Sequence, residues 1–488
     1  MDWDIIEVES EIPTIYAKNV HLIVESNTRN ASEPVVEFDE INVVTRRFDG
    51  NVEPKTKRYQ VQYDYIIGNP PFVGGRLMSE NQKQDVIDIF GAKWKNVGNL
   101  DYVCCWYKKA AGLMKINPRC RAALVSTNSI CQGEQVANLW QKLFDDGIRI
   151  NFAHRTFRWD SEASLKAHVH CIIVGFSYQQ TKSNYIYDNE KKNEATNINA
   201  YLIDAPNVFA ESRQTPICSV PEIGIGNKPI DGGNYLFSLE EKEAFVRIEP
   251  LSSSYFHPYY GAEEFINQRP RYCLWLGVCP PNELRKMPHC MKRVEAVRDL
   301  RLSSKSAGTR KLGDTPTRFH IENMPQNDYI LVPCHSSEKR RYVPMGFMHP
   351  NDICSNAVLL IPEATLYHFG ILESNVHMAW MRAVCGRIKS DYRYSKDVVY
   401  NNFPWPNPTD EQKTRIEQTA QAILDARALY PDSSLADLYD ELTMPVELRR
   451  AHQENDRAVM QAYGFSVKTM TESQCVAELF KLYQELTK

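Results

Sequence analysis

Short apolar stretches alternate with amphipathic helical patterns between about residues 60 and 180. Apolar or alternating runs predict strands at residues 63–67, 121–126 and 167–176. Between the first two, apolar positions recur at helical spacing over residues 99–115, which predicts a helix. Strands that alternate with helices predict an α/β fold with a doubly wound, Rossmann-like sheet. Such sheets bind their ligands at the carboxyl ends of the strands.

The rest of the chain has a different pattern. Residues 179–199 are polar and lack periodicity, which predicts a loop or a hairpin. After Pro216 prolines and glycines become frequent, which indicates a domain boundary, and residues 234–405 mix short strand patterns with turns. From Thr409 the pattern is helical, with capping boxes that start at Thr409 and Thr471. We therefore expect a mixed α+β domain followed by an α-helical region.

Composition narrows the class of protein without identifying it. The 488 residues carry a net charge of −4, and apolar runs such as residues 357–361 are far too short to cross a membrane. The first residues lack the basic and apolar regions of a signal peptide. The 13 cysteines are an odd number without a C-x-x-C pair, which is typical of reduced thiols in the cytoplasm. We expect a cytoplasmic protein without a metal centre or a membrane contact.

Basic residues are concentrated in the middle of the chain. Residues 285–341 contain 13 lysines and arginines against 6 acidic residues, whereas residues 407–488 contain 9 against 14. This distribution is typical of a surface that binds a polyanion, although charge alone equally fits a solvated face without a partner. The residues that would position nucleic-acid phosphates are Arg301, Lys305, Arg310, Lys311, Lys339, Arg340 and Arg341.

The tetrapeptide Asn69-Pro70-Pro71-Phe72 follows the first predicted strand, which we expect to be buried. Each proline fixes φ and lacks an N–H, so the loop is stiff and its carbonyls are free to accept hydrogen bonds. The Asn69 side-chain oxygen and the Pro70 carbonyl could each accept an N–H of an exocyclic amine, while Phe72 stacks on the base. Such a base must be flipped out of its duplex. The other interpretation is a turn that only ends the strand.

Residues 63–75 (YDYIIGNPPFVGG) resemble the catalytic motif of amino-methylating DNA methyltransferases of the MmeI-like family. The similarity extends over about residues 60–488. The further motifs that carry it are residues 99–106 (NLDYVCCW), 123–135 (ALVSTNSICQGEQ), 152–163 (FAHRTFRWDSEA), 228–233 (KPIDGG), 280–286 (PPNELRK) and 400–406 (YNNFPWP). The resemblance implies an S-adenosylmethionine-dependent, adenine-N6-specific methyltransferase of a restriction–modification system, acting on double-stranded DNA.

The resemblance also implies how the chain is divided. Residues 61–215 would form the methyltransferase domain, residues 216–406 the target-recognition domain, and residues 407–488 a helical C-terminal domain. Residues 1–60 remain an unassigned segment that could retain part of the donor-binding half.

Several residues outside the tetrapeptide gain candidate roles from the resemblance. Phe157 or Trp159 would cover the other side of the target base, with ordinary core packing as the alternative. Asp101 would begin a helix beside the donor pocket, or serve only as a first-turn carboxylate that the helix dipole favours.

A helix is expected at residues 372–385, with Gly386 as its cap, and a charged segment follows it. This segment contains Lys389, Asp391 and Arg393. A carboxylate can accept from cytosine N4, and an arginine can bind guanine O6 and N7, so Asp391 and Arg393 are candidates for base readout. A local salt bridge between the two is the alternative.

One expected motif is missing. The family places a glycine-rich donor-binding motif ahead of the tetrapeptide, yet Gly50 is the only glycine before Gly68. A strand pattern at residues 20–25 ends in Glu25, which could hold the donor ribose. The chain thus looks N-terminally shortened, and a separate chain could supply the motif. Two hypotheses stay open: an active methyltransferase, and a DNA-binding specificity fragment that cannot methylate alone. No nuclease motif is found, so we do not expect this chain to cleave DNA.

Overall fold

The computed structural model describes residues 41–44, 56–59, 63–159, 169–188, 191–388 and 390–488. The chain divides into two compact units, Met1–Gln62 and Tyr63–Lys488. In the described part of the first unit, β1 (Ile41–Val44) pairs antiparallel with β2 (Thr56–Tyr59). Glu25 and the strand predicted before it lie outside the described residues. All elements named below belong to the second unit.

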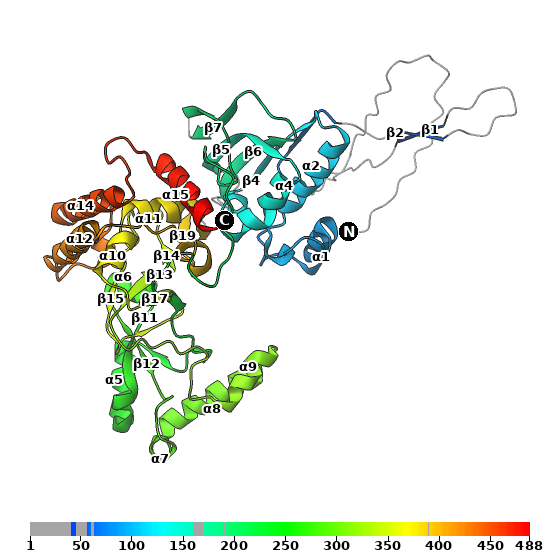
Figure 1. Ribbon diagram of the computed structural model, residues 1–488. Helices are drawn as coiled ribbons and strands as arrows, with labels where there is room; N and C mark the ends of the chain where they lie inside the picture. Colours follow the sequence, from blue (N-terminus) through cyan, green and yellow to red (C-terminus); the bar gives the residue numbers. More distant parts are fainter. Residues whose placement is uncertain (1–40, 45–55, 60–62, 160–168, 189–190, 389) are drawn as a thin grey trace, which may run out of the picture. The chain divides into compact units, whose positions relative to one another are not determined.

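Among the described residues, the second unit begins with a six-stranded sheet (Figure 1). Its strands are β3 (Tyr65–Gly68), β4 (Arg121–Thr127), β5 (Arg149–Trp159), β6 (Val169–Ser177), β7 (Asn184–Asp188) and β8 (Lys191–Ala195), in the order β3-β4-β6-β5-β7-β8. β3, β4 and β5 run in the same direction, because β4 is parallel to β3 and β6 is antiparallel to both β4 and β5. The predicted α/β sheet is confirmed, and the polar residues after β6 form the hairpin β7–β8.

Helices pack beside this sheet. They are α1 (Glu80–Phe90), α2 (Cys104–Ile116), α3 (Gly133–Gln135) and α4 (Gln141–Asp145), with a π-helical turn (Val136–Trp140) between α3 and α4. The ring of Tyr107 on α2 stacks on Phe176 of β6 with 5.1 Å between centroids, and Trp140 meets Tyr107 edge-on at 5.3 Å. These buried rings hold the helices against the sheet.

β3 differs from the buried strand that its apolar sequence predicted. Ile67 is 82% exposed and Tyr65 is 68% exposed. Within the described residues β3 stands at the end of the strand order and pairs only with β4. Strands of α/β sheets are normally covered on both faces, whereas one edge of β3 has no partner among the described strands and its apolar side chains Tyr65 and Ile67 are exposed.

Short strands and helices fill the middle of the chain, which confirms the predicted mixed α+β architecture. The strands are β9 (Gly224–Ile225), β10 (Leu236–Phe237), β11 (Phe256–Tyr260), β12 (Arg271–Leu274), β13 (Tyr329–Pro333), β14 (His335–Ser336), β15 (Gly346–Met348), β16 (Ile353–Cys354), β17 (Val358–Pro362), β18 (Gly386–Ile388) and β19 (Asp391–Arg393). They form sheets of order β10-β12-β11-β16, β15-β13-β17-β9 and β14-β19-β18. The helices are α5 (Leu239–Ile248), α6 (Ala262–Asn267), α7 (Pro281–Leu284), α8 (Pro288–Leu302) and α9 (Ala307–Lys311).

The last part of the chain is helical, as predicted. From Thr409 its helices are α12 (Asp410–Ala428), α13 (Leu435–Leu438), α14 (Val446–Ala462) and α15 (Glu472–Leu486), and the mixed region before it also contains α10 (Leu366–Leu372) and α11 (Asn375–Val384). The capping boxes at Thr409 and Thr471 are confirmed at the starts of α12 and α15. The helix expected at residues 372–385 is α11, but Gly386 begins β18 and does not cap the helix. Within the described residues, no helix combines the length and the apolarity that crossing a membrane requires.

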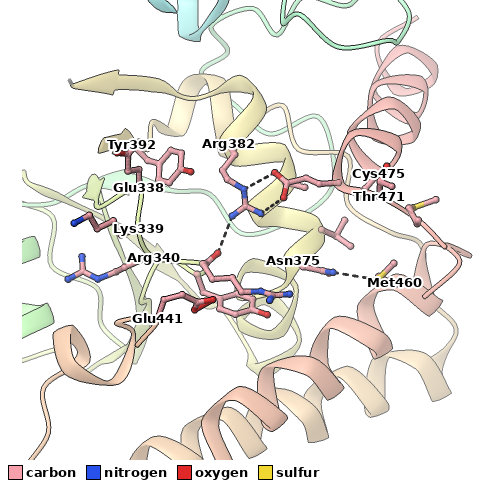
Figure 2. Close-up of a pocket in the computed structure, with 16 residues that line it drawn as sticks. Glu338, Lys339, Arg340, Asn375, Arg382, Tyr392, Glu441, Met460, Thr471 and Cys475 are labelled. Atoms are coloured by element: carbon pink, nitrogen blue, oxygen red, sulfur yellow. Dashed lines mark hydrogen bonds and ion pairs between the residues drawn. The ribbon is translucent and has the colours of Figure 1, made fainter. Parts of the chain in front are cut away.

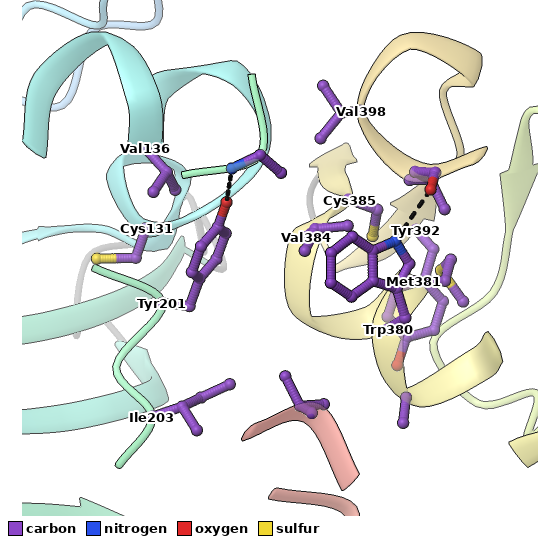
Figure 3. Packing of buried hydrophobic residues seen from close by; sticks show 14 of the residues in the cluster. Cys131, Val136, Tyr201, Ile203, Trp380, Met381, Val384, Cys385, Tyr392 and Val398 are labelled. Carbon is purple, nitrogen blue, oxygen red and sulfur yellow. Dashed lines mark hydrogen bonds between the residues drawn. The ribbon is translucent and has the colours of Figure 1, made fainter. Parts of the chain in front are cut away.

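A continuous hydrophobic cluster joins the first sheet to α11 and the C-terminal helices. Figure 3 shows part of it, with Tyr201 near Cys131 and Val136, and Trp380 near Val384. The Tyr201 hydroxyl accepts a hydrogen bond from the Ala210 N–H at 3.0 Å. The Trp380 indole donates to the Val399 carbonyl at 2.9 Å. Each of these buried polar atoms therefore has a hydrogen-bond partner, which offsets the cost of removing it from water.

Candidate active site and nucleic-acid interface

The tetrapeptide Asn69-Pro70-Pro71-Phe72 begins where β3 ends. Pro70 is buried, Phe72 is half-buried, and Asn69 and Pro71 are exposed. Pro70 suits this position because it has no N–H that burial would leave unpaired. The Asn69 side chain is thus held at the carboxyl end of a strand and is open to a ligand. Its position is the predicted one, and its catalytic role stays a prediction.

The carboxyl ends of β3, β4 and β5 meet at the same edge of the sheet. Thr127 of β4 and Phe157 of β5 both pair with Cys171 of β6, so they lie in one row across the strands. Because β4 and β6 lie between β3 and β5, β3 and β5 are about 14 Å apart. Phe157 is half-buried, and the side chain of Trp159 lies outside the described residues. The base-pocket roles of both rings stay predictions.

Asp101 connects two loops at this edge. It lies three residues before α2 begins at Cys104, and its carbonyl accepts from the Cys104 N–H at 3.0 Å, so it opens the turn that leads into the helix. Its Oδ1 accepts a hydrogen bond from the Gly75 N–H at 2.8 Å, and its Oδ2 accepts one from the Ser129 hydroxyl at 2.6 Å. Both oxygens are therefore engaged by the protein. A contact between Asp101 and the methyl donor stays a prediction.

Asp391 and Arg393 lie on β19, with Tyr392 buried between them. Because side chains alternate along a strand, both charged groups are on its exposed side. Asp391 Oδ1 accepts a hydrogen bond from the Glu338 N–H at 3.2 Å. In the part of the chain that the structure describes, Asp391 and Arg393 form no ion pair, so the alternative of a local salt bridge is wrong. Lys389 lies outside that part.

The basic residues Lys339, Arg340 and Arg341 lie beside this strand, because β14, which precedes them, pairs with β19. Lys339 and Arg341 are exposed. All three line a pocket of about 480 Å³, which Arg382 on α11 also lines (Figure 2). Arg382 is neutralised by Glu472, whose two carboxylate oxygens accept from its Nε at 2.8 Å and its Nη2 at 2.9 Å. Two segments about 50 residues apart in sequence thus form one surface, which we call the ribbon surface: Lys339, Arg340, Arg341, Asp391 and Arg393.

A buried ion pair holds the backbone at Met345, four residues after Arg341 in the chain. Arg427 on α12 donates to Glu373 Oε1 at 2.9 Å, and Glu373 is completely buried. The same two side chains bind the backbone of Met345. Its N–H donates to Glu373 at 2.7 Å, and its carbonyl accepts from Arg427 at 2.6 Å. Arg427 Nε also donates to the Tyr439 hydroxyl at 2.8 Å. Burial raises the pKa of Glu373 to about 7, although the Arg427 charge opposes this rise.

The prediction that Arg301 contacts a phosphate is wrong. The side chain is completely buried and donates five hydrogen bonds of 2.8–3.0 Å to backbone carbonyls. These carbonyls belong to Pro229, Ile230, Leu312, Thr315 and Arg318. Burial lowers the pKa of Arg301. The sequence showed the charge of Arg301, but it did not show the backbone carbonyls that accept all of its hydrogen bonds.

Replacing Arg301 by methionine should destabilise the fold by about 3 kcal/mol, because buried carbonyls lose their donors. Arg301→Met should not change the salt dependence of DNA binding, because the buried side chain contacts no phosphate. Lys305→Met, an exposed change just beyond the same helix, should leave the melting temperature unchanged. Thermal denaturation and DNA binding measured at several salt concentrations test both variants. A stable Arg301→Met protein with a reduced salt slope would contradict the structural role.

Lys305, Arg310 and Lys311 are exposed, on α9 and the turn before it. Arg310 Nη1 donates to the carbonyls of Ser304 and Lys305, both at 2.9 Å, which fixes its position. These residues belong to a different element from the ribbon surface. Their contacts with phosphates stay predictions.

The sequence reasoning missed how the loops at the sheet edge are connected. Gln135 Oε1 accepts from the Asp101 N–H at 3.1 Å, which adds to the contact between Asp101 and Ser129. The available signal was a run of polar residues, Thr127 to Ser129, at the carboxyl end of the strand β4. This run also forms part of the family motif at residues 123–135.

Three family models match successive parts of the chain. Residues 23–188 match the model described as MmeI, DNA-methyltransferase domain. Residues 204–407 match MmeI, target recognition domain, and residues 408–488 match MmeI, C-terminal domain.

Two known proteins are similar over most of the chain. DNA methyltransferase A of Bacillus subtilis (strain 168) is 40% identical over 424 residues, which are 87% of this chain and 48% of the relative. The solved structure of the Type IIL restriction-modification enzyme MmeI in complex with DNA is 47% identical, with a TM-score of 0.82, over 87% of this chain and 57% of that one. The chain therefore spans about half the length of these relatives. It belongs to the MmeI-like family of type IIL restriction–modification methyltransferases, with the methyltransferase, target-recognition and C-terminal domains of that family.

Proposed function

We propose that this protein transfers a methyl group from S-adenosylmethionine to N6 of an adenine flipped out of double-stranded DNA, within a restriction–modification system. The observation that carries the proposal is the exposed Asn69 in a stiff Pro-Pro loop at the carboxyl end of β3, in a chain of this family. The protein would act in the cytoplasm, where its DNA substrate lies.

The chemistry rests on two oxygen acceptors. The lone pair of an exocyclic amine is delocalised into the base, which makes the nitrogen a poor nucleophile. If the Asn69 side-chain oxygen and the Pro70 carbonyl each accept one N–H, they favour a tetrahedral nitrogen and stabilise its developing positive charge. Phe72 stacks on one face of the base, and Phe157 or Trp159 covers the other side. The choice of adenine over cytosine rests on the family, since both amines suit these acceptors.

Recognition of the DNA sequence is proposed for the ribbon surface. Asp391 and Arg393 are exposed on one side of β19, and among the described residues a backbone N–H engages one of the two Asp391 oxygens. A carboxylate and a guanidinium so placed can read base edges, whereas Lys339 and Arg341 carry the charge that phosphates attract. Lys305, Arg310 and Lys311 would add phosphate contacts from α9, and Lys389 would add one near β19.

Alanine substitutions at Arg393 and Lys339 should affect DNA binding in different ways. Arg393→Ala should relax the preference at one base pair by about 1–3 kcal/mol, because a bidentate base contact is lost. Lys339→Ala should weaken binding to all sequences alike and lower the slope of affinity against salt by about one. Binding of the two variants to a panel of single-base duplex variants, repeated over a range of salt, separates these outcomes. Equal loss on every duplex for Arg393→Ala would contradict base readout.

The methyl donor needs a site that the described residues do not complete. One edge of β3 is unpaired among the described strands and Tyr65 and Ile67 are exposed, which favours pairing with further strands. A separate chain that adds the donor-binding half of the domain at this edge is the partner we propose, with Asp101 and Glu25 as candidate donor contacts. Without such a half, the chain would be a specificity fragment that binds DNA but does not methylate it.

One experiment separates the two functions. The purified chain is incubated with duplex DNA and S-adenosylmethionine carrying a labelled methyl group, and donor binding is measured in parallel by calorimetry. Transfer of label to adenine N6, identified after digestion to nucleosides, supports the methyltransferase. DNA binding with neither transfer nor donor binding supports the specificity fragment.

A further inference from the structure

Two hydrogen bonds to residues 101 and 102, which we call the clamp, fix the loop that follows the catalytic tetrapeptide. The Val73 carbonyl accepts from the Tyr102 N–H at 2.9 Å, and the Gly75 N–H donates to Asp101 Oδ1 at 2.8 Å. A Cβ added at Gly75 would lie 3.1 Å from the Leu100 carbonyl oxygen, so the two backbones are in close contact. The position of Phe72, one residue before this clamp, therefore depends on Asp101.

Asp101 is itself held by the segment after β4. Ser129 Oγ lies 2.6 Å from Asp101 Oδ2 and 2.7 Å from Thr127 Oγ1. Because the ionised carboxylate can only accept, Ser129 donates to Asp101 and Thr127 donates to Ser129. Gln135 Oε1 accepts from the Asp101 N–H at 3.1 Å. Trp140 fixes the same segment from the core by donating to the Ile130 carbonyl at 2.9 Å.

This segment also touches the sheet that carries the ribbon surface. Gly133 has a φ of +56°, which favours glycine, and a Cβ added there would lie 3.4 Å from both Cα and N of Gly386, the first residue of β18. β18 pairs with β19, which carries Asp391 and Arg393. A series of contacts thus runs from the ribbon surface through Gly133 and Asp101 to the catalytic loop.

We propose that Asp101 is a positioning residue that sets the catalytic loop, and that the segment from Thr127 to Gln135 relays the position of β18 to it. The proposal rests on the proposed function, because it assigns the ribbon surface to DNA and the tetrapeptide to catalysis. It gives a physical route by which binding of the correct DNA sequence orders Asn69 and Phe72. Asp101 acts here through hydrogen bonds and not through its charge.

Amide hydrogen exchange of the full chain, followed by mass spectrometry, tests the clamp without any methyl transfer. Asp101→Ala should speed exchange at Gly75 by about tenfold, the effect of one lost hydrogen bond. Asp101→Asn should restore it, because the amide can accept from Gly75 with Oδ1 and donate to Ser129 with Nδ2. Ser129→Ala leaves the Gly75 bond in place and provides a milder variant if Asp101→Ala does not fold. Its exchange at Gly75 should lie between those of the wild type and Asp101→Ala. Unchanged exchange at Gly75 in Asp101→Ala, or no rescue by asparagine, overturns the positioning role.

The relay is tested with a duplex that has been selected by binding to this chain from a random pool. In the wild type, this duplex should slow exchange at Gly75. Gly133→Ala should lose at least half of that protection while its DNA affinity stays within about twofold. Gly112→Ala, on α2 with open space for the added methyl, is the matched control and should behave like the wild type. If Gly75 does not respond to DNA in the wild type, or responds equally in Gly133→Ala, the relay is overturned. Neither result depends on methyl transfer, so the proposed function is judged separately.

Discussion

Replacing Asn69 by alanine should reduce methyl transfer to DNA by about 100-fold or more, with little change in DNA affinity or stability. The side chain is exposed at the end of β3, so its loss removes no core contact. What it removes is a fixed acceptor for the amino group, at the point where charge develops in the reaction. Loss of one such preorganised hydrogen-bond partner typically costs about 2.7–4 kcal/mol of transition-state stabilisation.

Single-turnover transfer of a labelled methyl group, measured next to DNA binding, tests this expectation. Asn407→Ala is a matched control, because Asn407 is also exposed and lies in the segment before α12. The control should transfer methyl groups at the wild-type rate. Transfer that persists in Asn69→Ala would remove the tetrapeptide from the mechanism.

Replacing Arg427 by methionine should destabilise the protein by about 3–5 kcal/mol. The change leaves the completely buried Glu373 carboxylate without its partner. An unpaired buried charge is strongly destabilising. It also removes the donor to the Met345 carbonyl, and Met345 follows Arg341 of the ribbon surface by four residues in the chain. We therefore expect a lower melting temperature together with weaker DNA binding. Arg450→Met, an exposed change on α14, is the matched control and should shift stability by less than about 0.5 kcal/mol.

The penalty in Arg427→Met should depend on pH. Burial raises the pKa of Glu373 in the folded protein to about 7, above its ordinary value of 4.5 in the unfolded chain. The folded state therefore binds the proton more readily, so the contribution of this group to stability increases as pH falls from 7 towards 4.5. A protonated Glu373 has no charge to leave unpaired. The difference in melting temperature between wild type and Arg427→Met should thus be smaller at pH 5 than at pH 8. A constant difference would contradict this explanation.

Local patterns in the sequence predicted the elements well. The capping boxes at Thr409 and Thr471 and the helical spacing that became α2 involve residues that are neighbours along the chain. Such signals need no knowledge of distant segments. The tetrapeptide at the end of β3 was found for the same reason, because two consecutive prolines constrain the loop whatever surrounds it.

The misassigned residues are those whose surroundings come from distant parts of the sequence. Arg301 looked like a phosphate contact because its charge was visible, whereas the carbonyls that bury it come from the segments around residues 230 and 315. Asp101 was expected at a helix start, but the sequence did not show that its two oxygens join Gly75 to Ser129. β3 looked buried because its residues are apolar, yet exposure depends on which strands lie beside it.

The sequence by itself determined the family, the order of the elements and the stiff loop that presents Asn69, because these depend on residue type and short-range spacing. Only the tertiary structure decided which charges are exposed, since burial of Arg301 and exposure of Arg393 depend on segments that folding brings together. The pairing of β14 with β19 places Lys339 beside Asp391, although about 50 residues separate them. Hydrogen bonds between distant backbones, rather than local propensity, fix that arrangement.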